Sequence, residues 1–162
     1  MDGAVVVNAR SAYLAHMTAT PTADRRSIDD TLAELVEEFD LLGDWEGRIE
    51  YVIDLGKGLA PLDEADRIEA HKVPGCAAQV WLAVHPTGDR LVFTADSDSA
   101  ISKGNIALLL SLYSDRTPDE ILAFDARAAL DRLGLPQALT PQRANGLNNM
   151  VGRIRAAAMA QA

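Results

Sequence analysis

The segment from Ala100 to Tyr113 constrains the fold of this chain more than any other. Its aliphatic side chains do not keep to one face of a helix but surround it: Ile106, Ala107, Leu108, Leu109, Leu110 and Leu112. A helix that is apolar on almost every side must be covered by other elements, so the pattern predicts a central core helix. The polar stretch before it, residues 96–99, can cap its first turn, and Asp98 is a natural capping residue.

Two amphipathic helices are predicted before this segment. The first begins after Ser27, a suitable N-cap, and ends at Gly43. The second opens at Asp44 and closes near residues 56–58. Helical spacing assigns buried positions to Ile28, Leu32, Leu35, Val36 and Phe39 in the first helix, and to Trp45, Ile49, Val52 and Ile53 in the second.

The middle of the chain changes from helical to alternating periodicity. Residues 79–85 alternate as a half-buried strand does, and residues 90–95 return after a hairpin loop at 86–89. Residues 68–73 form a weaker strand candidate. We therefore predict a small, curved, antiparallel three-stranded sheet.

Three further helices are predicted after the central one. Residues 117–120 (Thr-Pro-Asp-Glu) form a strong helix start, a short helix covers 126–133 and ends at Gly134, and the last helix begins at Thr140-Pro141. The spacing in the last helix turns Leu147, Met150, Val151 and Ile154 inward and Arg153 and Arg155 outward. Helices before and after one antiparallel sheet predict a single α+β domain over residues 27–162.

The first 26 residues show no sustained periodicity, and we expect them to form a flexible leader. Met17, within this stretch, is an alternative start site.

Charge and composition restrict the partners of this protein. The chain has 162 residues, a length typical of one domain, and a formal net charge of −9, which disfavours binding to nucleic acids and to anionic membranes. No apolar run approaches the roughly 20 residues of a membrane helix. One cysteine excludes an internal disulfide, and a cytoplasmic protein is expected. The three histidines lack the spacing of metal ligands, so we expect no metal.

Cys76, the only cysteine, lies between a predicted turn and a predicted strand. Pro74 fixes its own φ and Gly75 can adopt a positive φ, so this pair predicts a turn. A thiol at a loop tip can meet a sulfur atom of another molecule. A free cysteine can equally behave as a small buried hydrophobe. This segment alone leaves both interpretations open.

Four segments, in order, carry a more specific signal. They are Val73-Pro74-Gly75-Cys76 with Val80-Trp81, Asp96-Ser97-Asp98, Lys103-Gly104 with Ala107-Leu108, and residues 139–147 (Leu-Thr-Pro-Gln-Arg-Ala-Asn-Gly-Leu). Together they resemble the SufE-type cysteine desulfuration proteins, sulfur acceptors of iron–sulfur cluster assembly, over about residues 28–158. The resemblance implies a fold similar to that of the U-type cluster scaffolds. Because a cluster needs several thiolates, a single cysteine disfavours scaffolding itself.

The resemblance implies that Cys76 accepts sulfur from the persulfide of a SufS-like cysteine desulfurase and passes it on to cluster assembly, with the Suf scaffold as a candidate acceptor. It also implies that Gly75, Asp98 and Arg143 support the cysteine loop or the persulfide. Pyridoxal phosphate then belongs to the partner desulfurase, and the chain acts as its activator rather than as a stand-alone enzyme with a cofactor.

Two departures from the family pattern bear on activation or partner choice. Residues 77–78 are both alanine where the family usually has Gln-Ser, and Ala138 replaces a polar residue that is often histidine. Two other functions stay open: a single-cysteine thiol enzyme of the thioltransferase or peroxidase kind, and a non-catalytic binding module with an inert cysteine.

Overall fold

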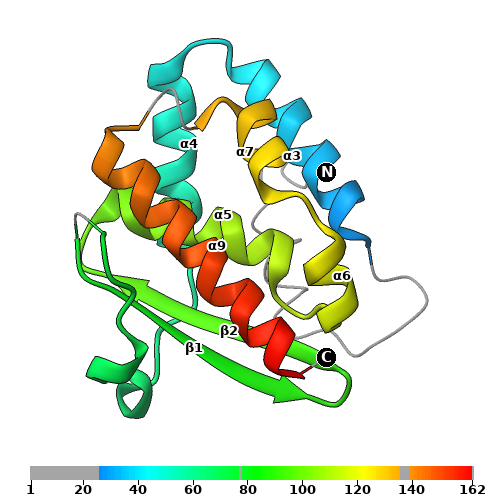
Figure 1. Cartoon of the computed structure of the whole chain (residues 1–162). Coiled ribbons are helices and arrows are strands. Elements are labelled where there is room, and N and C mark those ends of the chain that lie inside the picture. Colours follow the sequence, from blue (N-terminus) through cyan, green and yellow to red (C-terminus); the bar gives the residue numbers. More distant parts are fainter. Residues whose placement is uncertain (1–25, 77, 136–138, 162) are drawn as a thin grey trace.

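The central helix α5 (Ala100–Tyr113) runs through the middle of the molecule, as its apolar surface predicts. The computed structural model describes residues 26–76, 78–135 and 139–161, and α5 is buried from Gly104 to Tyr113. Figure 1 shows the other helices around α5 and the strands below them. Of the predicted leader only Arg26 is described, where it pairs with Glu34. The remaining leader residues, position 77 of the first departure and position 138 lie outside the described residues, whereas Ala78 is described.

The main partner of α5 is the helix α4 (Trp45–Lys57), and two glycines set the distance between them. A Cβ atom on Gly56 would lie 2.6 Å from the backbone nitrogen of Gly104, and one on Gly104 would lie 2.2 Å from the carbonyl oxygen of Val52. No side chain fits at either position. The two backbones therefore touch, and this contact fixes which face of α4 is buried.

The predicted buried stripe of α4 is consequently wrong in part. Val52 is buried, together with Leu55 and Gly56, but Ile49 is 39% exposed and Trp45 only half-buried. The glycine contact rotates α4 so that its C-terminal half, rather than Trp45 and Ile49, faces the core.

The helix α3 (Ile28–Leu42) agrees more closely with its sequence pattern. Ser27 caps it by accepting a hydrogen bond from the Asp30 backbone N–H at 3.0 Å. Its buried face includes Ile28, Leu32, Leu35 and Phe39, as predicted.

The sheet contains two described strands rather than three. The strands β1 (Val80–Thr87) and β2 (Arg90–Ser97) pair antiparallel, with Val80 opposite Ser97 and Thr87 opposite Arg90. In the predicted third strand only Lys72 forms a bridge, to Trp81. The 3-10 helix η2 (Glu69–His71) takes up the preceding residues, and Pro74 has no N–H to extend the pairing. The three-stranded sheet is therefore not confirmed.

The strand β1 is covered on both faces over its first half, not on one as predicted. Val80 and Leu82 belong to the main core, whereas Trp81 and Ala83 form a second small cluster with Leu62. Leu62 precedes the 3-10 helix η1 (Glu64–Asp66), so the chain between α4 and β1 folds over the outer face of the strand.

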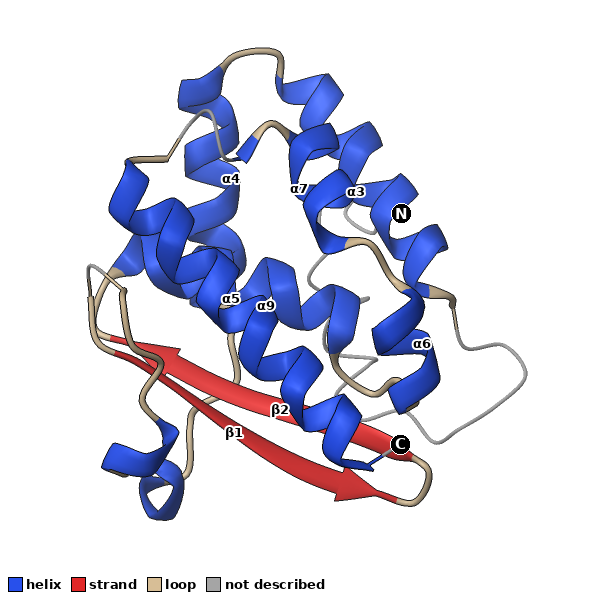
Figure 2. Cartoon of the chain, in the orientation of Figure 1, coloured by secondary structure: helices blue, strands red, loops and turns tan. Residues whose placement is uncertain are grey.

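The remaining described helices are α6 (Pro118–Ala123), α7 (Ala126–Leu133) and α9 (Pro141–Gln161). Thr117 and Glu120 form a full capping box at α6, as their spacing predicts. The helix α9 crosses the front of the helical layer in Figure 2. The two arginines of α9 that the sequence predicts to face outward, Arg153 and Arg155, do not simply point into solvent. Arg153 donates hydrogen bonds to the carbonyl oxygens of residues 70 and 72, and Arg155 donates to those of residues 122 and 124.

Candidate functional site around Cys76

One glycine conformation and two hydrogen bonds hold the turn that carries Cys76. Gly75 has φ +78°, the left-handed conformation that glycine tolerates best. The Asn149 side-chain amide on α9 donates a hydrogen bond to the Pro74 carbonyl oxygen at 2.7 Å. The Val73 backbone N–H donates to the carbonyl oxygen of Val80 at 2.9 Å, which ties the turn to the start of β1. The predicted turn is thus present and is fastened from two sides.

The thiol of Cys76 is half-buried beside a small pocket between α5 and α9. The pocket has a volume of about 20 Å³, which is room for roughly one water-sized atom. Two helix faces and the start of β1 line it, through Val80, Ser102, Asn105, Ile106, Arg143, Gly146, Leu147 and Met150. The spacing of three and four residues on each helix places these side chains on one face.

Gly146 allows α9 to lie directly against Cys76. A Cβ atom at position 146 would lie 3.0 Å from the Cys76 Sγ and 3.2 Å from its Cα. Glycine in a helix interior costs roughly 0.5–1 kcal/mol relative to alanine, and at position 146 the close approach of Cys76 leaves no room for a larger residue without a shift. Sequence reasoning gave Gly146 no role, although a glycine inside a predicted helix was the available signal.

The electrostatic surroundings of the thiol favour its neutral form. Burial raises the pKa of the Cys76 thiol above its ordinary value of 9.0. The predicted site residue Arg143 lies on the same pocket, where its guanidinium donates a hydrogen bond to Ser99 Oγ at 3.4 Å. Within the described part of the chain no carboxylate forms an ion pair with Arg143. It is therefore a positive charge available near an anionic sulfur.

Asp98 does not cap α5, contrary to the role predicted from its position. The N-cap is Ser99, whose side chain accepts a hydrogen bond from the Ser102 backbone N–H. The carboxylate of Asp98 instead accepts hydrogen bonds from the backbone N–H and the side-chain amide of Gln79, at 3.1 and 3.3 Å. Asp98 thus joins the end of β2 to the residue three positions after the cysteine.

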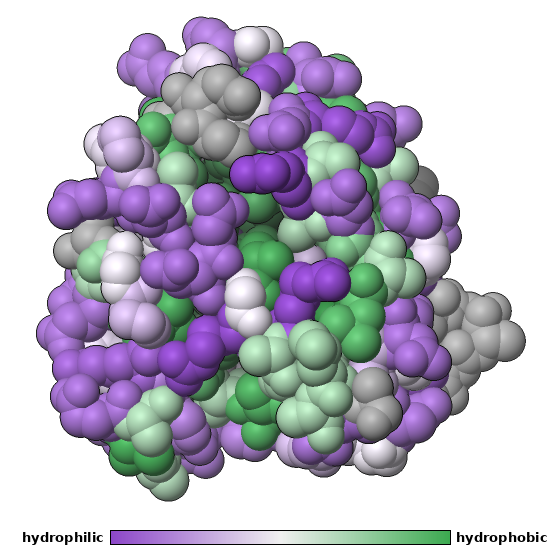
Figure 3. Space-filling view, viewed as in Figure 1, coloured by the Kyte–Doolittle hydropathy of each residue, from purple (hydrophilic) through white to green (hydrophobic). Residues whose placement is uncertain are grey.

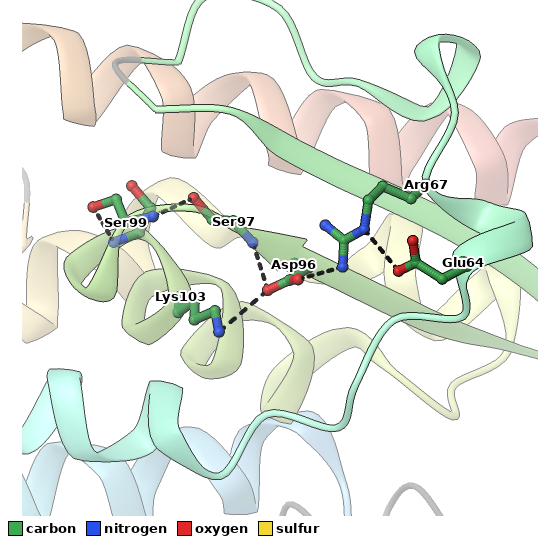
Figure 4. Close-up of polar contacts among 7 residues, drawn as sticks. Glu64, Arg67, Asp96, Ser97, Ser99 and Lys103 are labelled. Atoms are coloured by element: carbon green, nitrogen blue, oxygen red, sulfur yellow. Dashed lines mark hydrogen bonds and ion pairs between the residues drawn. The ribbon is translucent and has the colours of Figure 1, made fainter.

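A charged cluster braces the chain segment before the cysteine turn (Figure 4). Arg67 binds Asp96 at 2.7 Å and Glu64 at 3.1 Å, and Lys103 approaches Asp96 at 3.5 Å. Burial acts to raise the pKa of Asp96, but hydrogen bonds from Arg67 and the Ser97 N–H and the charge of Lys103 hold that pKa below its ordinary value. This cluster, which sequence reasoning missed because its members are far apart in the chain, fixes η1 to β2 and α5.

The site offers one nucleophile and few other chemical groups. His71 and His85 point to partners elsewhere, the carbonyl oxygen of Asp66 and the hydroxyl of Thr94, and neither lines the pocket. Among the described residues, no group of histidine, cysteine, aspartate and glutamate side chains is arranged to hold a metal ion.

No described helix has the length and apolar character to cross a membrane. The face in Figure 3 is mainly hydrophilic, with apolar residues exposed near the C-terminal end of α9, where Met159 is 69% exposed.

Comparisons with known proteins agree with this arrangement. A family model described as "SufE: Fe-S metabolism associated domain" matches residues 33–158. An uncharacterized SufE-like protein of Rhizobium etli is 43% identical over 136 residues, which cover 82% of this chain and 92% of the relative. Another from Rhizobium meliloti is 41% identical over 132 residues, covering 79% and 94%.

A solved structure shares the fold. The solution structure of a hypothetical protein from Thermus thermophilus has a TM-score of 0.67 at 18% identity, and the match covers 80% of this chain and 94% of that one. The family match includes the cysteine turn and α9 up to residue 158, and the two relatives match over most of the chain. The chain therefore belongs to the SufE family of proteins associated with iron–sulfur metabolism.

Proposed function

We propose that this protein is a sulfur acceptor that takes a sulfur atom from a SufS-like cysteine desulfurase onto Cys76. One observation carries the proposal: the only thiol of the chain lies on a turn beside a pocket with room for about one further atom. A persulfide is a thiol extended by one sulfur. The pocket therefore suits the loaded form of Cys76.

The transfer step needs a thiolate at Cys76 and a persulfide on the desulfurase. Cys76 loses its proton, and its sulfur attacks the outer sulfur of the donor persulfide. A new S–S bond forms on Cys76 as the S–S bond of the donor breaks, and the donor cysteine leaves as a thiolate that takes up a proton. No external oxidant or reductant is consumed. Pyridoxal phosphate remains with the desulfurase.

A single cysteine suits a carrier. A second thiol close by would attack the persulfide, form a disulfide and release the sulfur as sulfide. With only Cys76 in the chain, this intramolecular loss cannot occur. The half-buried position also limits attack by external thiols.

The closed turn must open before the thiol can reach another protein. Burial raises the pKa of Cys76 and keeps most of the thiol protonated, so the closed form is a poor nucleophile. Docking of the desulfurase would expose the thiol and so remove the burial that raises its pKa, which favours the thiolate. We further propose that the loaded protein hands its sulfur to an iron–sulfur cluster scaffold.

The test is desulfurase activity with and without this protein, for the wild type and Cys76→Ser. We expect the wild type to stimulate cysteine turnover and the serine variant to bind the desulfurase without stimulating it. Mass spectrometry should find one added sulfur atom on the wild type alone. Full stimulation by Cys76→Ser would contradict the carrier mechanism. Rapid peroxide turnover without a desulfurase would favour a thiol enzyme, and a thiol that resists alkylation in the native protein would favour a binding module.

A further inference from the structure

The pocket beside Cys76 contains a buried polar group that takes no part in the transfer step. Asn105 lies on α5 and lines the pocket, and only 6% of the residue is exposed. Its Oδ1 atom is buried and accepts no hydrogen bond from any residue that the structure describes. Burying an amide oxygen without a partner is unfavourable. Because no described residue bonds Oδ1, the amide can rotate and turn either its oxygen or its N–H groups toward the pocket.

The outer sulfur of a Cys76 persulfide is a suitable partner. An S–S bond is about 2 Å long, so the outer sulfur lies one bond beyond Sγ, and the pocket beside Cys76 has about 20 Å³ of space, room for roughly one such atom. Asn105 and Ser102, one helical turn apart, line the α5 side of this space. We propose that Asn105 is a positioning residue that hydrogen-bonds the outer sulfur of the Cys76 persulfide and holds it in the pocket. This inference rests on the proposed function.

The amide group suits both protonation states of a persulfide. Rotation about its last side-chain bond presents either an N–H donor or an oxygen acceptor to the same point. The N–H group binds the persulfide anion, and Oδ1 accepts the S–H of the neutral form. Because donation to a charged acceptor is the stronger of the two hydrogen bonds, Asn105 favours the anion. The anion repels thiolate reductants, so Asn105 also protects the bound sulfur.

The test measures the acidity of the persulfide without any desulfurase. The purified protein is loaded by incubation with inorganic polysulfide. The Cys76 thiolate attacks the end sulfur of the polysulfide and becomes a persulfide, and a polysulfide shorter by one sulfur leaves. Alkylation of the outer sulfur by iodoacetamide is then followed by mass spectrometry as a function of pH. The variants are Asn105→Ala, which removes the amide without filling the pocket, and the isosteric Asn105→Asp. Ser111→Ala, another buried polar change on α5 but away from the pocket, is the matched control.

We expect Asn105→Ala to raise the pH midpoint of persulfide alkylation by about one unit, a roughly tenfold change and the scale of one hydrogen bond to a charged group. Asn105→Asp should raise it further, because it replaces a donor with a negative charge. Ser111→Ala should match the wild type. Loss of the outer sulfur to dithiothreitol should be several-fold faster in both Asn105 variants, while the midpoint of the unloaded thiol stays unchanged in Asn105→Ala.

Equal midpoints in the wild type and both Asn105 variants would overturn the inference. A higher alkylation rate at every pH with an unchanged midpoint would also overturn it, since that result means only that the pocket has become more open. If Asn105→Ala does not fold, an Asn105→Asp midpoint equal to that of the wild type still overturns the inference, because a carboxylate beside the persulfide must raise it. Failure of the desulfurase to load the wild type would reject the proposed function but leave this result standing, because polysulfide supplies the sulfur.

Discussion

Gly146 of α9 lies so close to Cys76 that a methyl group on it would come within 3.0 Å of the sulfur. This distance is shorter than an ordinary van der Waals contact, and the backbone of α9 therefore forms one wall around the thiol. The packing around Cys76 thus depends on a glycine that is distant in the chain. A substitution of Gly146 by alanine should displace the thiol without adding or removing a charge near it.

Gly146→Ala should push the cysteine turn outward and make alkylation of Cys76 several-fold faster. Gly152→Ala is the matched control, because it lies on the same helix with nothing within 4 Å of the added methyl group. The control should raise the free energy of unfolding by roughly 0.5–1 kcal/mol through helix propensity and leave alkylation unchanged. In Gly146→Ala the contact with Cys76 should cancel that gain. If both variants gained the same free energy of unfolding and had the same alkylation rate, the cysteine turn would have moved aside without an energetic cost.

Asp98→Arg should also increase the reactivity of the thiol. The change removes the two hydrogen bonds from Asp98 to Gln79 and adds a positive charge at the edge of the cysteine loop. Loss of about 1 kcal/mol from the closed loop corresponds to roughly fivefold more of the open form, and alkylation should increase by at least this factor. Asp98→Asn keeps an oxygen acceptor for the Gln79 N–H and should remain close to the wild type. Lower stability of Asp98→Arg without faster alkylation would mean that the bond supports only the fold.

The raised pKa of Cys76 predicts a specific dependence of stability on pH. Burial makes the folded protein hold the thiol proton more tightly than the unfolded chain, whose thiol has the ordinary value of 9.0. The contribution of this group is complete below that value and is lost as the pH rises through the higher pKa of the folded state. The free energy of unfolding should therefore fall more steeply for the wild type than for Cys76→Ser as the pH rises past 9.0. Parallel curves would show that the thiol is solvated in the native protein.

The sequence predicted the features of the fold that depend on local interactions. Ser27 and Asp44 cap their helices, and Thr117 with Glu120 forms its capping box, because each motif lies within four residues. The burial of α5 followed from its composition. The turn at Cys76 and the position of Arg143 on the same pocket agree with the resemblance to the family.

The features that the sequence could not predict depend on contacts between distant segments. Asp98 and Ser99 are adjacent and both suit an N-cap, and only the position of Gln79 decides that Asp98 binds elsewhere. Residues 68–73 suit a strand, but a 3-10 turn binds the N–H groups of His71 and Lys72. Nothing in the sequence gives a reason to select Asn105, because helical periodicity concerns the apolar residues around it. That its Oδ1 atom has no described hydrogen-bond partner follows only from the three-dimensional structure.

Asn149 and Asp98 hold opposite ends of the cysteine loop, at Pro74 and at Gln79. Asn149→Ala should weaken the closed loop by about 1 kcal/mol and make alkylation of Cys76 roughly fivefold faster. Asn148→Ala changes an exposed neighbour on the same helix and is the control. It should change the free energy of unfolding by no more than about a few tenths of a kcal/mol and leave the alkylation rate unchanged. The measurements are alkylation rate and denaturant unfolding.

Combining Asn149→Ala with Asp98→Ala tests whether the loop opens as one unit. If a single opening breaks both bonds, the two effects multiply, and the double variant should react about twenty-five-fold faster than the wild type. If each end opens separately and either opening exposes the thiol, the double variant should reach only about fivefold. We expect the larger factor, because the loop between the two bonds is short and Gly146 packs against its centre. The smaller factor would contradict a concerted opening and would mean that the partner needs to release only one end.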